Sequence, residues 1–497
     1  MKKQIKIDPK NTEKKFSKSW KTCVGSGNMS LMMRKEAVDA LTMVQEEIGF
    51  DYIRGHGILS DVMATYQENE DYSSPFNFTY VDQVYDQFQK LHIRPVVELS
   101  FMPRSLASGE ETVFYWKGNI SLPKSWDKWC FCVDGLVRHL IERYGLEEVR
   151  KWPFEVWNEP NFSEFWVAPN LDEYWPMYTC TADTIKKIDS KLIVGGPAAD
   201  TNGDEYLDDF LGRCRANNTP LDFVSRHAYM STAPERKGDF DYQKFHKWTF
   251  ILDKIHNARV IMERHGYQDL PLWITEFNTS YTPKNPIHDT VENAAMIAPV
   301  LARGGEEADA MAYWTFSDVF EELGIPRSEF HGGFGLVGNR LVKKPTYHLY
   351  RMMNKMKNNV LYQDENLLVT GDGAGKISAL GWNMTGEELE YEFTVPAQKD
   401  SMSVLREEVS KKCGDSRTTW ADLGYPRYPS QEELEAIHKA SEPGYSSTVL
   451  HPENDAFTVK LTVPGIGVCL TCLNEYQRKL SDYDYMEDDK ILIWEEE

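Results

Sequence analysis

From about residue 20 to residue 345 the chain alternates short apolar runs with longer amphipathic stretches, and this alternation restricts the fold more than any other feature of the chain. Short buried runs separated by helical segments are typical of repeated β/α units around a parallel sheet. The runs that fit strands are Thr22–Gly25, Tyr52–Arg54, Pro95–Ser100, Phe154–Trp157, Leu192–Gly195, Phe223–Ser225, Leu272–Thr275 and Ala310–Trp314. Eight such units close a barrel, so the sequence predicts an α/β fold of the (β/α)8 TIM type.

Amphipathic stretches with helical spacing lie between these runs, as a barrel of β/α units requires. Examples are Val81–Leu91, Lys124–Tyr144, Leu171–Lys187, Phe245–Gly266 and Thr290–Ala302. We expect these helices to cover the outside of the barrel and to bury its strands.

After residue 345 the pattern changes to short strand-like runs, several of which alternate apolar and polar residues and are separated by turns. These runs are Val360–Tyr362, Leu367–Thr370, Ile377–Trp382, Glu388–Val395, Ser447–Leu450 and Phe457–Val463. They predict an antiparallel β-sandwich, to which Gln4–Ile7 is expected to add an edge strand. We therefore predict a barrel domain at residues 15–345 and a sandwich domain made from residues 1–14 and 346–497.

A small helical insertion is expected inside the sandwich, at about residues 416–445. Ser430 is followed three residues later by Glu433, which is the spacing of a capping box. In this motif each side chain accepts a hydrogen bond from a free backbone N–H of the first helical turn. The pair therefore predicts that a helix begins directly after Ser430.

Composition excludes several classes of partner. The chain carries 55 Lys and Arg against 77 Asp and Glu, and the resulting net charge of −22 repels nucleic acid and anionic membranes. No stretch has the length and apolarity of a membrane-spanning helix, and the N-terminus lacks the apolar segment of a secretory signal. Eight cysteines among 497 residues do not resemble a disulfide framework, so we expect a cytoplasmic protein.

Two acidic residues stand where apolar runs end. Glu159 lies in Trp157–Pro160 after the fourth predicted strand, and Glu276 lies in Trp273–Asn278 at the seventh. Reactive residues of barrel enzymes come from the C-terminal ends of the strands. Two carboxylates about 5 Å apart permit retaining glycoside hydrolysis, with Glu276 as nucleophile and Glu159 as acid and then base. A single Glu is more often a surface or salt-bridged residue, but the paired positions favour catalysis.

Several longer segments accompany the two acids. They are Tyr52–Leu59, Glu98–Pro103, Trp157–Asn161, His227–Tyr229, Thr275–Tyr281, Tyr313–Glu322, Gly332–Leu336 and Gly424–Ser430. In these segments the chain resembles the β-xylosidases of glycoside hydrolase family 39, which belongs to a clan of (β/α)8-barrel retaining glycosidases. The resemblance implies retention, with Glu159 as acid/base and Glu276 as nucleophile. It also implies release of D-xylose from the non-reducing end of β-1,4-xylo-oligosaccharides through a covalent glycosyl-enzyme.

Residues near the two acids are expected to bind substrate or to orient the acids. The resemblance implies that Asn158 hydrogen-bonds the sugar 2-hydroxyl, although an Asn that shapes the turn before Pro160 is the alternative. His227 and Tyr229 lie two residues apart at the sixth predicted strand, so their side chains share a face. We expect one of them to orient Glu276 and the other to reach the sugar.

Other candidates come from the second and eighth predicted strands. Arg54 is expected to keep Glu276 ionised through a charge-assisted bond, and a structural Arg in the barrel mouth is the alternative. His56 is expected to bind sugar hydroxyls, and Trp314 to form a floor under the sugar face. The resemblance suggests that Glu321 or Glu322 binds a hydroxyl, and we favour Glu322. Further candidates for the pocket lining are Tyr281, Tyr115 and Trp166, each of which could equally be a packing residue.

No metal or organic cofactor is expected, because two carboxylates suffice for the reaction. Gly371–Lys376 lacks the pattern of a phosphate loop, and Cys469 and Cys472 lie three residues apart in a strand-like stretch, which argues against a shared zinc or redox role. The alternatives are another family 39 glycosidase, an α-L-arabinosidase or α-L-iduronidase, or a non-catalytic carbohydrate-binding protein. Because members of this family are often oligomeric, the resemblance makes a homo-oligomer one expected state.

Overall fold

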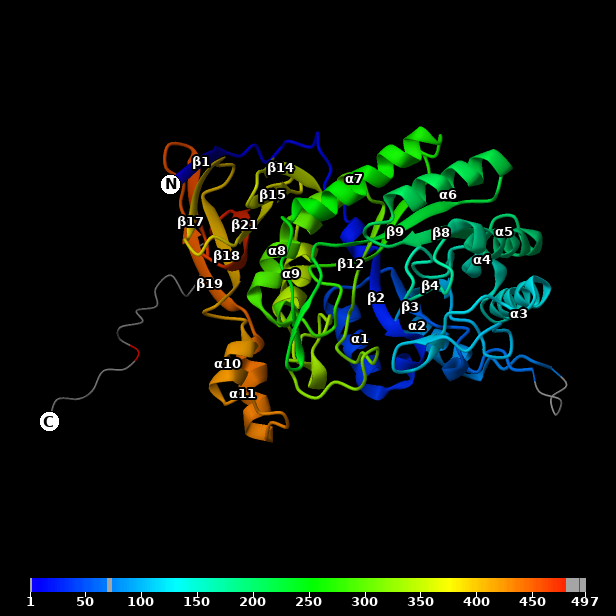
Figure 1. Ribbon diagram of the computed structural model, residues 1–497. Helices are drawn as coiled ribbons and strands as arrows, with labels where there is room; N and C mark the ends of the chain where they lie inside the picture. The colour runs from blue at the N-terminus through cyan, green and yellow to red at the C-terminus, as the bar shows by residue number, and fades with distance from the viewer. Residues whose placement is uncertain (1, 69–73, 480–490, 492–497) are drawn as a thin grey trace.

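The computed structural model of the chain describes residues 2–68, 74–479 and 491, and it contains a closed barrel beside a separate set of sheets (Figure 1). The barrel strands are β2 (Cys23–Asn28), β3 (Tyr52–His56), β4 (Arg94–Leu99), β7 (Pro153–Val156), β8 (Ile193–Ala199), β9 (Phe223–Tyr229), β12 (Leu272–Asn278) and β13 (Ala310–Tyr313). Each strand pairs in parallel with its neighbours, and β13 closes the ring on β2. The predicted (β/α)8 barrel and all eight predicted strand positions are confirmed.

Helices surround this barrel and connect its strands, as Figure 1 shows for α3, α5, α6 and α7. Their bounds are α1 (Lys35–Glu47), α2 (Thr79–Lys90), α3 (Trp126–Tyr144), α4 (Leu146–Val149), α5 (Leu171–Ile188), α6 (Asp204–Asn217), α7 (Thr249–Arg264), α8 (Val291–Arg303) and α9 (Pro345–Asn354). Short antiparallel pairs occur in the loops: β5 (Thr112–Val113) with β6 (Gly118–Asn119), and β10 (Glu235–Lys237) with β11 (Phe240–Tyr242).

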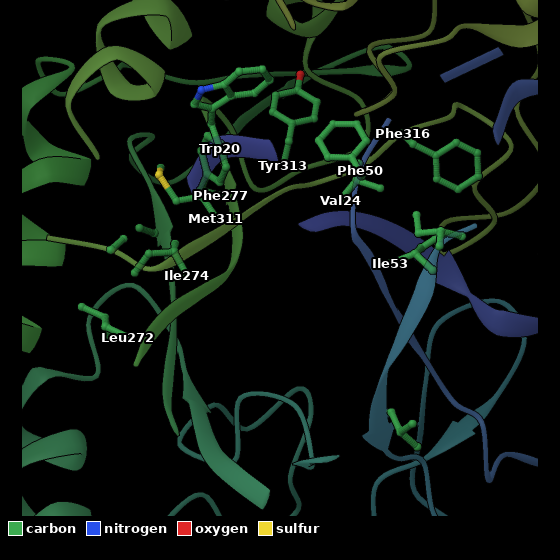
Figure 2. Packing of buried hydrophobic residues seen from close by; sticks show 14 of the residues in the cluster. Trp20, Val24, Phe50, Ile53, Leu272, Ile274, Phe277, Met311, Tyr313 and Phe316 are labelled. Carbon is green, nitrogen blue, oxygen red and sulfur yellow. The ribbon is translucent and has the colours of Figure 1, made fainter. Parts of the chain in front are cut away.

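Strand side chains alternate between the barrel interior and the surrounding helices, and this alternation places the core and the polar mouth next to each other. Phe277 of β12 packs outward among Trp20, Met311 and Tyr313 (Figure 2). Its ring and that of Tyr313 meet edge to face with centroids 5.9 Å apart. Its neighbour Glu276 points to the opposite face, into the barrel. Burial of each such apolar side chain contributes about 1.5–3 kcal/mol to stability.

The C-terminal part contains two further sheets. One has the order β14-β15-β16-β21-β18-β19, and the other β1-β17-β20. The strands are β14 (Asn359–Gln363), β15 (Leu367–Gly371), β16 (Lys376–Asn383), β17 (Leu389–Pro396), β18 (Ser401–Ser410), β19 (Gly444–Leu450), β20 (Ala456–Val463), β21 (Gly467–Tyr476) and β1 (Lys2–Lys6). The predicted sandwich is confirmed, with one difference: the edge strand β1 pairs with β17 in parallel.

Alternation in the six-stranded sheet explains how the two parts of the chain are joined. Leu367 and Val369 of β15 pack into the core between the two sheets. Leu368 points the other way and joins the large cluster that also fills the barrel and its helices. Both faces of this sheet are therefore buried, one of them against barrel helices such as α8.

The predicted domain limits stay a prediction, and two observations bear on where the barrel ends. Residue 345 begins α9, whose Tyr347 and Leu349 belong to the large barrel cluster. At the other end, residues 480–490 and 492–497 of the predicted sandwich range lie outside the described residues. We propose that the barrel unit extends through α9.

The helical insertion contains α10 (Ser416–Asp422) and α11 (Gln431–Ser441), which lie below the sandwich in Figure 1. The Ser430 hydroxyl accepts a bond from the Glu433 N–H, and the Glu433 carboxylate accepts one from the Ser430 N–H. The predicted capping box is thus present. Gly371–Lys376 forms the turn between β15 and β16, and Cys469 and Cys472 both lie on β21. Within the described residues we found no helix with the length and apolarity needed to cross a bilayer.

Candidate active site

Two carboxylates from non-neighbouring strands meet inside the barrel mouth. Glu159 follows β7, whereas Glu276 lies within β12, and two strands, β8 and β9, lie between them in the barrel. Both residues are more than nine-tenths buried. An oxygen of each carboxylate lies within 4.8 Å of the other. Only barrel closure brings these two positions together, since they are 117 residues apart in the sequence.

The backbone that carries Glu159 is strained. Trp157 and Glu159 adopt positive φ angles of 70° and 42°, which cost residues with a side chain about 1–3 kcal/mol each. Packing holds this conformation: the buried Trp157 indole donates to the Phe165 carbonyl at 2.8 Å, and its ring lies 4.9 Å from that of Trp166. Trp166, a candidate for the pocket lining, is therefore a core residue that supports the acid loop.

Glu276 is placed by an irregularity in β12. The register shifts between Ile274 and Glu276 on the side of β9, and between Ile274 and Phe277 on the side of β13. Such bulges re-aim a side chain near active sites. Glu276 then accepts a bond from the Arg54 guanidinium at 2.7 Å and one from the Tyr229 hydroxyl at 2.6 Å.

Arg54 is the fully buried hub of this site. Its guanidinium contacts Glu98 at 2.8 Å and Glu155 at 2.6 Å, in addition to Glu276. It also donates to the Asn158 amide oxygen at 2.9 Å, which leaves the Asn158 NH2 group as the end that can donate to a sugar hydroxyl. The guanidinium fork thus fixes the Glu276 carboxylate and the Asn158 amide relative to each other.

Sequence reasoning did not identify Glu98 and Glu155 as site residues. Both are carboxylates within apolar strands, β4 and β7, and both are fully buried. A charged residue inside an apolar strand requires a partner, and this signal was present in the sequence. The identity of that partner, Arg54, depends on the closed barrel.

His227 and Tyr229 of β9 share the inward face, as their spacing predicted. Tyr229 orients Glu276, whereas the His227 Nδ1 lies 2.6 Å from a Glu159 oxygen and 3.6 Å from a Glu276 oxygen. His227 thus contacts both acids and is placed to orient Glu159. The sequence predicts that one of these two residues orients Glu276 and the other reaches the sugar, and it does not predict the contact between His227 and Glu159.

His56 and Glu322 line the opposite wall. The His56 Nδ1 contacts Glu98 at 2.8 Å, and its Nε2 lies 3.7 Å from Glu276 and 3.8 Å from Glu322. Glu321 instead points away and contacts Arg34 at 2.9 Å. The geometry therefore places Glu322, and not Glu321, near the same His56 nitrogen as Glu276.

Aromatic side chains complete the wall and the rim. Trp314 is buried, and its ring lies 4.8 Å from the His56 ring, where it can face a sugar. Tyr281 is 44% exposed at the rim, with its ring 6.4 Å from that of Tyr229. Tyr115 is exposed and lines a cleft of about 750 Å³ that the helical insertion shares.

Burial and neighbouring charges separate the proton affinities of the two acids. Burial raises the pKa of Glu159 well above its usual range, and the charge of Glu276 raises it further. Burial also raises the pKa of Glu276, but Arg54, His56 and the Tyr229 hydroxyl oppose this effect. Burial lowers the pKa of His227 well below its usual range, so Glu159 contacts a neutral imidazole. The arrangement favours a protonated Glu159 beside an ionised Glu276.

The same atoms could in principle bind a cation. Glu159, His227 and Glu276 each present a ligand atom, all within 4.8 Å of one another, and these are ligand types that zinc accepts. However, the Arg54 guanidinium already lies 2.7 Å from Glu276 and would repel a metal ion at this position. The site is therefore better suited to proton transfer and nucleophilic attack than to holding a metal.

Comparisons with known proteins agree with this geometry. The family model of glycosyl hydrolases family 39 matches residues 3–456. A β-xylosidase from Geobacillus stearothermophilus is 42% identical over 494 residues, covering 97% of this chain and 98% of that protein. The crystal structure of a monomeric β-xylosidase from Caulobacter crescentus superposes with a TM-score of 0.88 at 29% identity, covering 95% of this chain and 99% of that one.

The chain is also similar, more distantly, to enzymes with α-L-iduronidase activity. An α-L-iduronidase from Mus musculus is 28% identical over 200 residues, covering 36% of this chain and 28% of that protein. In contrast, the family match extends over nearly the entire sequence. The chain is therefore a glycosidase that belongs to glycosyl hydrolases family 39.

Proposed function

We propose that this glycosidase releases D-xylose from the non-reducing end of β-1,4-xylo-oligosaccharides, with retention of anomeric configuration. The observation that carries the proposal is the short separation of the Glu159 and Glu276 carboxylates, within 4.8 Å. Retaining enzymes hold their two carboxyls about 5–5.5 Å apart, whereas inverting enzymes need roughly 6.5–9.5 Å to admit a water. The β-xylosidase relatives with high coverage support xylose as the sugar.

In the first step a Glu276 oxygen attacks the anomeric carbon, and the bond from that carbon to the leaving-group oxygen breaks. Glu159 donates its proton to the departing oxygen, which leaves as an alcohol. Esterification removes the charge of Glu276, one of the two main reasons why Glu159 holds its proton. Glu159 then acts as a base toward water, whose oxygen displaces Glu276 from the sugar.

Surrounding groups would stabilise the positive charge that develops on the sugar. Arg54 and Tyr229 hold the nucleophile ionised and oriented through bonds of 2.7 and 2.6 Å. The free NH2 end of Asn158 would donate to the 2-hydroxyl, a contact that strengthens as the transition state forms. The remaining proposed substrate contacts are His56, His227, Tyr281, Trp314 and Glu322.

The charge of the pocket favours a neutral sugar over iduronate. Arg54 is already in contact with Glu98, Glu155 and Glu276, and Glu322 adds a further carboxyl nearby. A uronate carboxylate would enter this acidic environment without a free cation among the groups just named. An α-L-iduronidase activity is therefore the less favoured alternative. The charge of the pocket does not bear on an α-L-arabinosidase activity, which is tested by comparing cleavage of an aryl α-L-arabinoside with that of the aryl β-xyloside.

The direct test is proton NMR of xylobiose hydrolysis, which observes the first anomer formed. We expect β-xylose first, followed by slower mutarotation to the α form. Immediate release of α-xylose would refute retention. Faster cleavage of an aryl α-L-arabinoside or α-L-iduronide than of the aryl β-xyloside would instead refute the assignment of the sugar.

A non-catalytic carbohydrate-binding protein is tested with Glu159→Gln and Glu276→Gln. Each variant keeps the size of the side chain, so we expect xylobiose binding by calorimetry to persist. Turnover of xylobiose should be lost in both. Unchanged turnover in either variant would exclude the assigned chemistry.

We further propose a cytoplasmic location, where short imported oligosaccharides would be the substrate. The eight cysteines are all free thiols in the structure, which fits a reducing compartment. The homo-oligomer expected from the sequence stays a prediction, and the similar enzyme of Caulobacter crescentus is a monomer. Light scattering of the purified protein would determine the assembly.

A further inference from the structure

Asn161 ends the Trp157–Asn161 segment and takes no part in the mechanism described above. Its side-chain NH2 donates to the Asp200 carboxylate at 2.7 Å, and its amide oxygen accepts from the Asp200 backbone N–H at 3.1 Å. These reciprocal bonds connect the loop after β7, which carries Glu159, to the residue that follows β8. Both partners are half-buried.

A second tie and tight packing surround this pair. The Glu159 backbone N–H donates to the Ala198 carbonyl at 3.1 Å, and both residues have positive φ angles, 42° and 52°. Conformations of this kind persist only where their surroundings hold them. A Cβ atom on Gly203 would lie 2.9 Å from both the Asn161 amide nitrogen and the Ala199 Cβ, so a larger residue there would crowd the pair.

We propose that Asn161 and Asp200 form a positioning pair for the acid/base: Asn161 fixes the loop that aims Glu159, and the Asp200 carboxylate helps to retain the proton until the leaving group takes it. This inference rests on the proposed role of Glu159. It assigns neither Asn161 nor Asp200 a contact with substrate.

The charges around Glu159 support the second half of the proposal. The charged groups that act on Glu159 are Arg54 of β3, Glu276 of β12, Glu322 of the loop after β13 and Asp200, and His227 of β9 contacts it directly. After burial and Glu276, the charge of Asp200 is the next largest influence that raises the pKa of Glu159, and Arg54 opposes these effects. Asp200 is thus a negative charge whose place near the acid is fixed by Asn161.

The positioning role is tested with Asn161→Ala and two aryl β-xylosides. Phenyl β-xyloside needs protonation of its leaving oxygen, whereas 2,4-dinitrophenyl β-xyloside departs without it. Because misplacement of a catalytic group by about 1 Å can cost roughly a hundredfold, we expect kcat/KM for the phenyl substrate to fall by roughly tenfold to a hundredfold. The value for the dinitrophenyl substrate should change little. Equal losses on both substrates would overturn the positioning role.

The charge is tested with Asp200→Asn, which keeps an oxygen that can accept from Asn161. The basic limb of the pH profile of kcat/KM reports the proton on Glu159. Removal of a negative neighbour makes that proton easier to lose, so we expect this limb to move to lower pH. An unshifted limb would overturn the proposed role of Asp200.

Asp222→Asn is the matched control. Asp222 accepts from the Val194 N–H at 2.8 Å at the opposite end of the barrel, and the substitution removes the same charge. Its basic limb should match that of the wild type, and an equal shift in both variants would also overturn the proposal. If the wild-type enzyme cleaved no β-xyloside, the proposed function itself would be wrong. This outcome is distinct from a failure of the positioning role, which would appear only in the variants.

Discussion

Replacement of Tyr229 by Phe removes one hydroxyl from the site and leaves the ring in place. That hydroxyl donates to a Glu276 oxygen at 2.6 Å, and both residues are buried. A short bond to a carboxylate in such surroundings is charge-assisted. The substitution therefore tests how much Glu276, the proposed nucleophile, depends on a single hydrogen bond.

The expected loss follows from the energy of such a bond. Hydrogen bonds to charged groups contribute about 1.5–3 kcal/mol. Since about 1.4 kcal/mol corresponds to a tenfold change in rate, kcat/KM for xylobiose should fall roughly tenfold to a hundredfold. The hydroxyl also lowers the pKa of Glu276. Its loss raises that pKa, so the acid limb of the profile should move to higher pH.

Tyr178→Phe is the control for the loss of a buried hydroxyl. Tyr178 lies on α5 and donates to the Pro220 carbonyl at 2.9 Å, away from the two acids. This variant should retain the wild-type pH profile. Activity of Tyr229→Phe within twofold of the wild type, with an unshifted acid limb, would refute the reasoning.

Three further outcomes are expected. The buried Lys344 ammonium lies 2.6 Å from Asp289 and also contacts Asp318 at 2.5 Å, so Lys344→Met should lower the free energy of unfolding by about 3–5 kcal/mol in urea titrations; a loss below about 1 kcal/mol would contradict this. Treatment with EDTA should leave xylobiose turnover unchanged, and a loss restored by zinc would instead indicate a metal site. Ser430→Ala removes the capping box with Glu433 and should lower the free energy of unfolding by roughly 0.5–2 kcal/mol without changing kcat/KM; a lowered kcat/KM would contradict this and indicate that the insertion contributes to catalysis.

The barrel was predictable because its signal is local. Each strand is a short apolar run, since helices cover it on one side and other strands fill the interior. At the end that forms the site, however, five strands are longer than predicted, namely β2, β3, β8, β9 and β12, whereas β4, β7 and β13 end one residue earlier. His227 and Tyr229 belong to β9, and Glu276 belongs to β12, because inward-facing polar side chains extend the parallel pairing into the mouth.

Strand β18 was missed because its polar residues hide the alternation. It contains Arg406, Glu407 and Glu408, yet lies between β21 and β19 inside the sheet. Glu407 can be buried because two cations neutralise its charge. Arg351 of α9 lies 3.0 Å from its carboxylate, and Lys355, the residue that follows α9, also contacts it. No local feature of the sequence indicates these ion-pair partners, which are more than 50 residues away.

The active site likewise contains residues that local sequence patterns predict and contacts that depend on the folded barrel. The two acids could be proposed from their positions at strand ends. Two of the three carboxylates around Arg54 could not be assigned, because Glu98 and Glu155 meet it only when β3, β4 and β7 pair in the folded barrel. The contact between Glu159 and His227 likewise requires β7 and β9 in their folded places.

The most direct test of the proposed mechanism is to identify the residue that forms a covalent bond to the sugar. A 2-deoxy-2-fluoro-β-xyloside with a dinitrophenyl leaving group forms the glycosyl-enzyme quickly and releases it slowly. Peptide mass spectrometry should then find the label on Glu276. A label on Glu159, or inactivation without any covalent label, would contradict the roles assigned to the two acids.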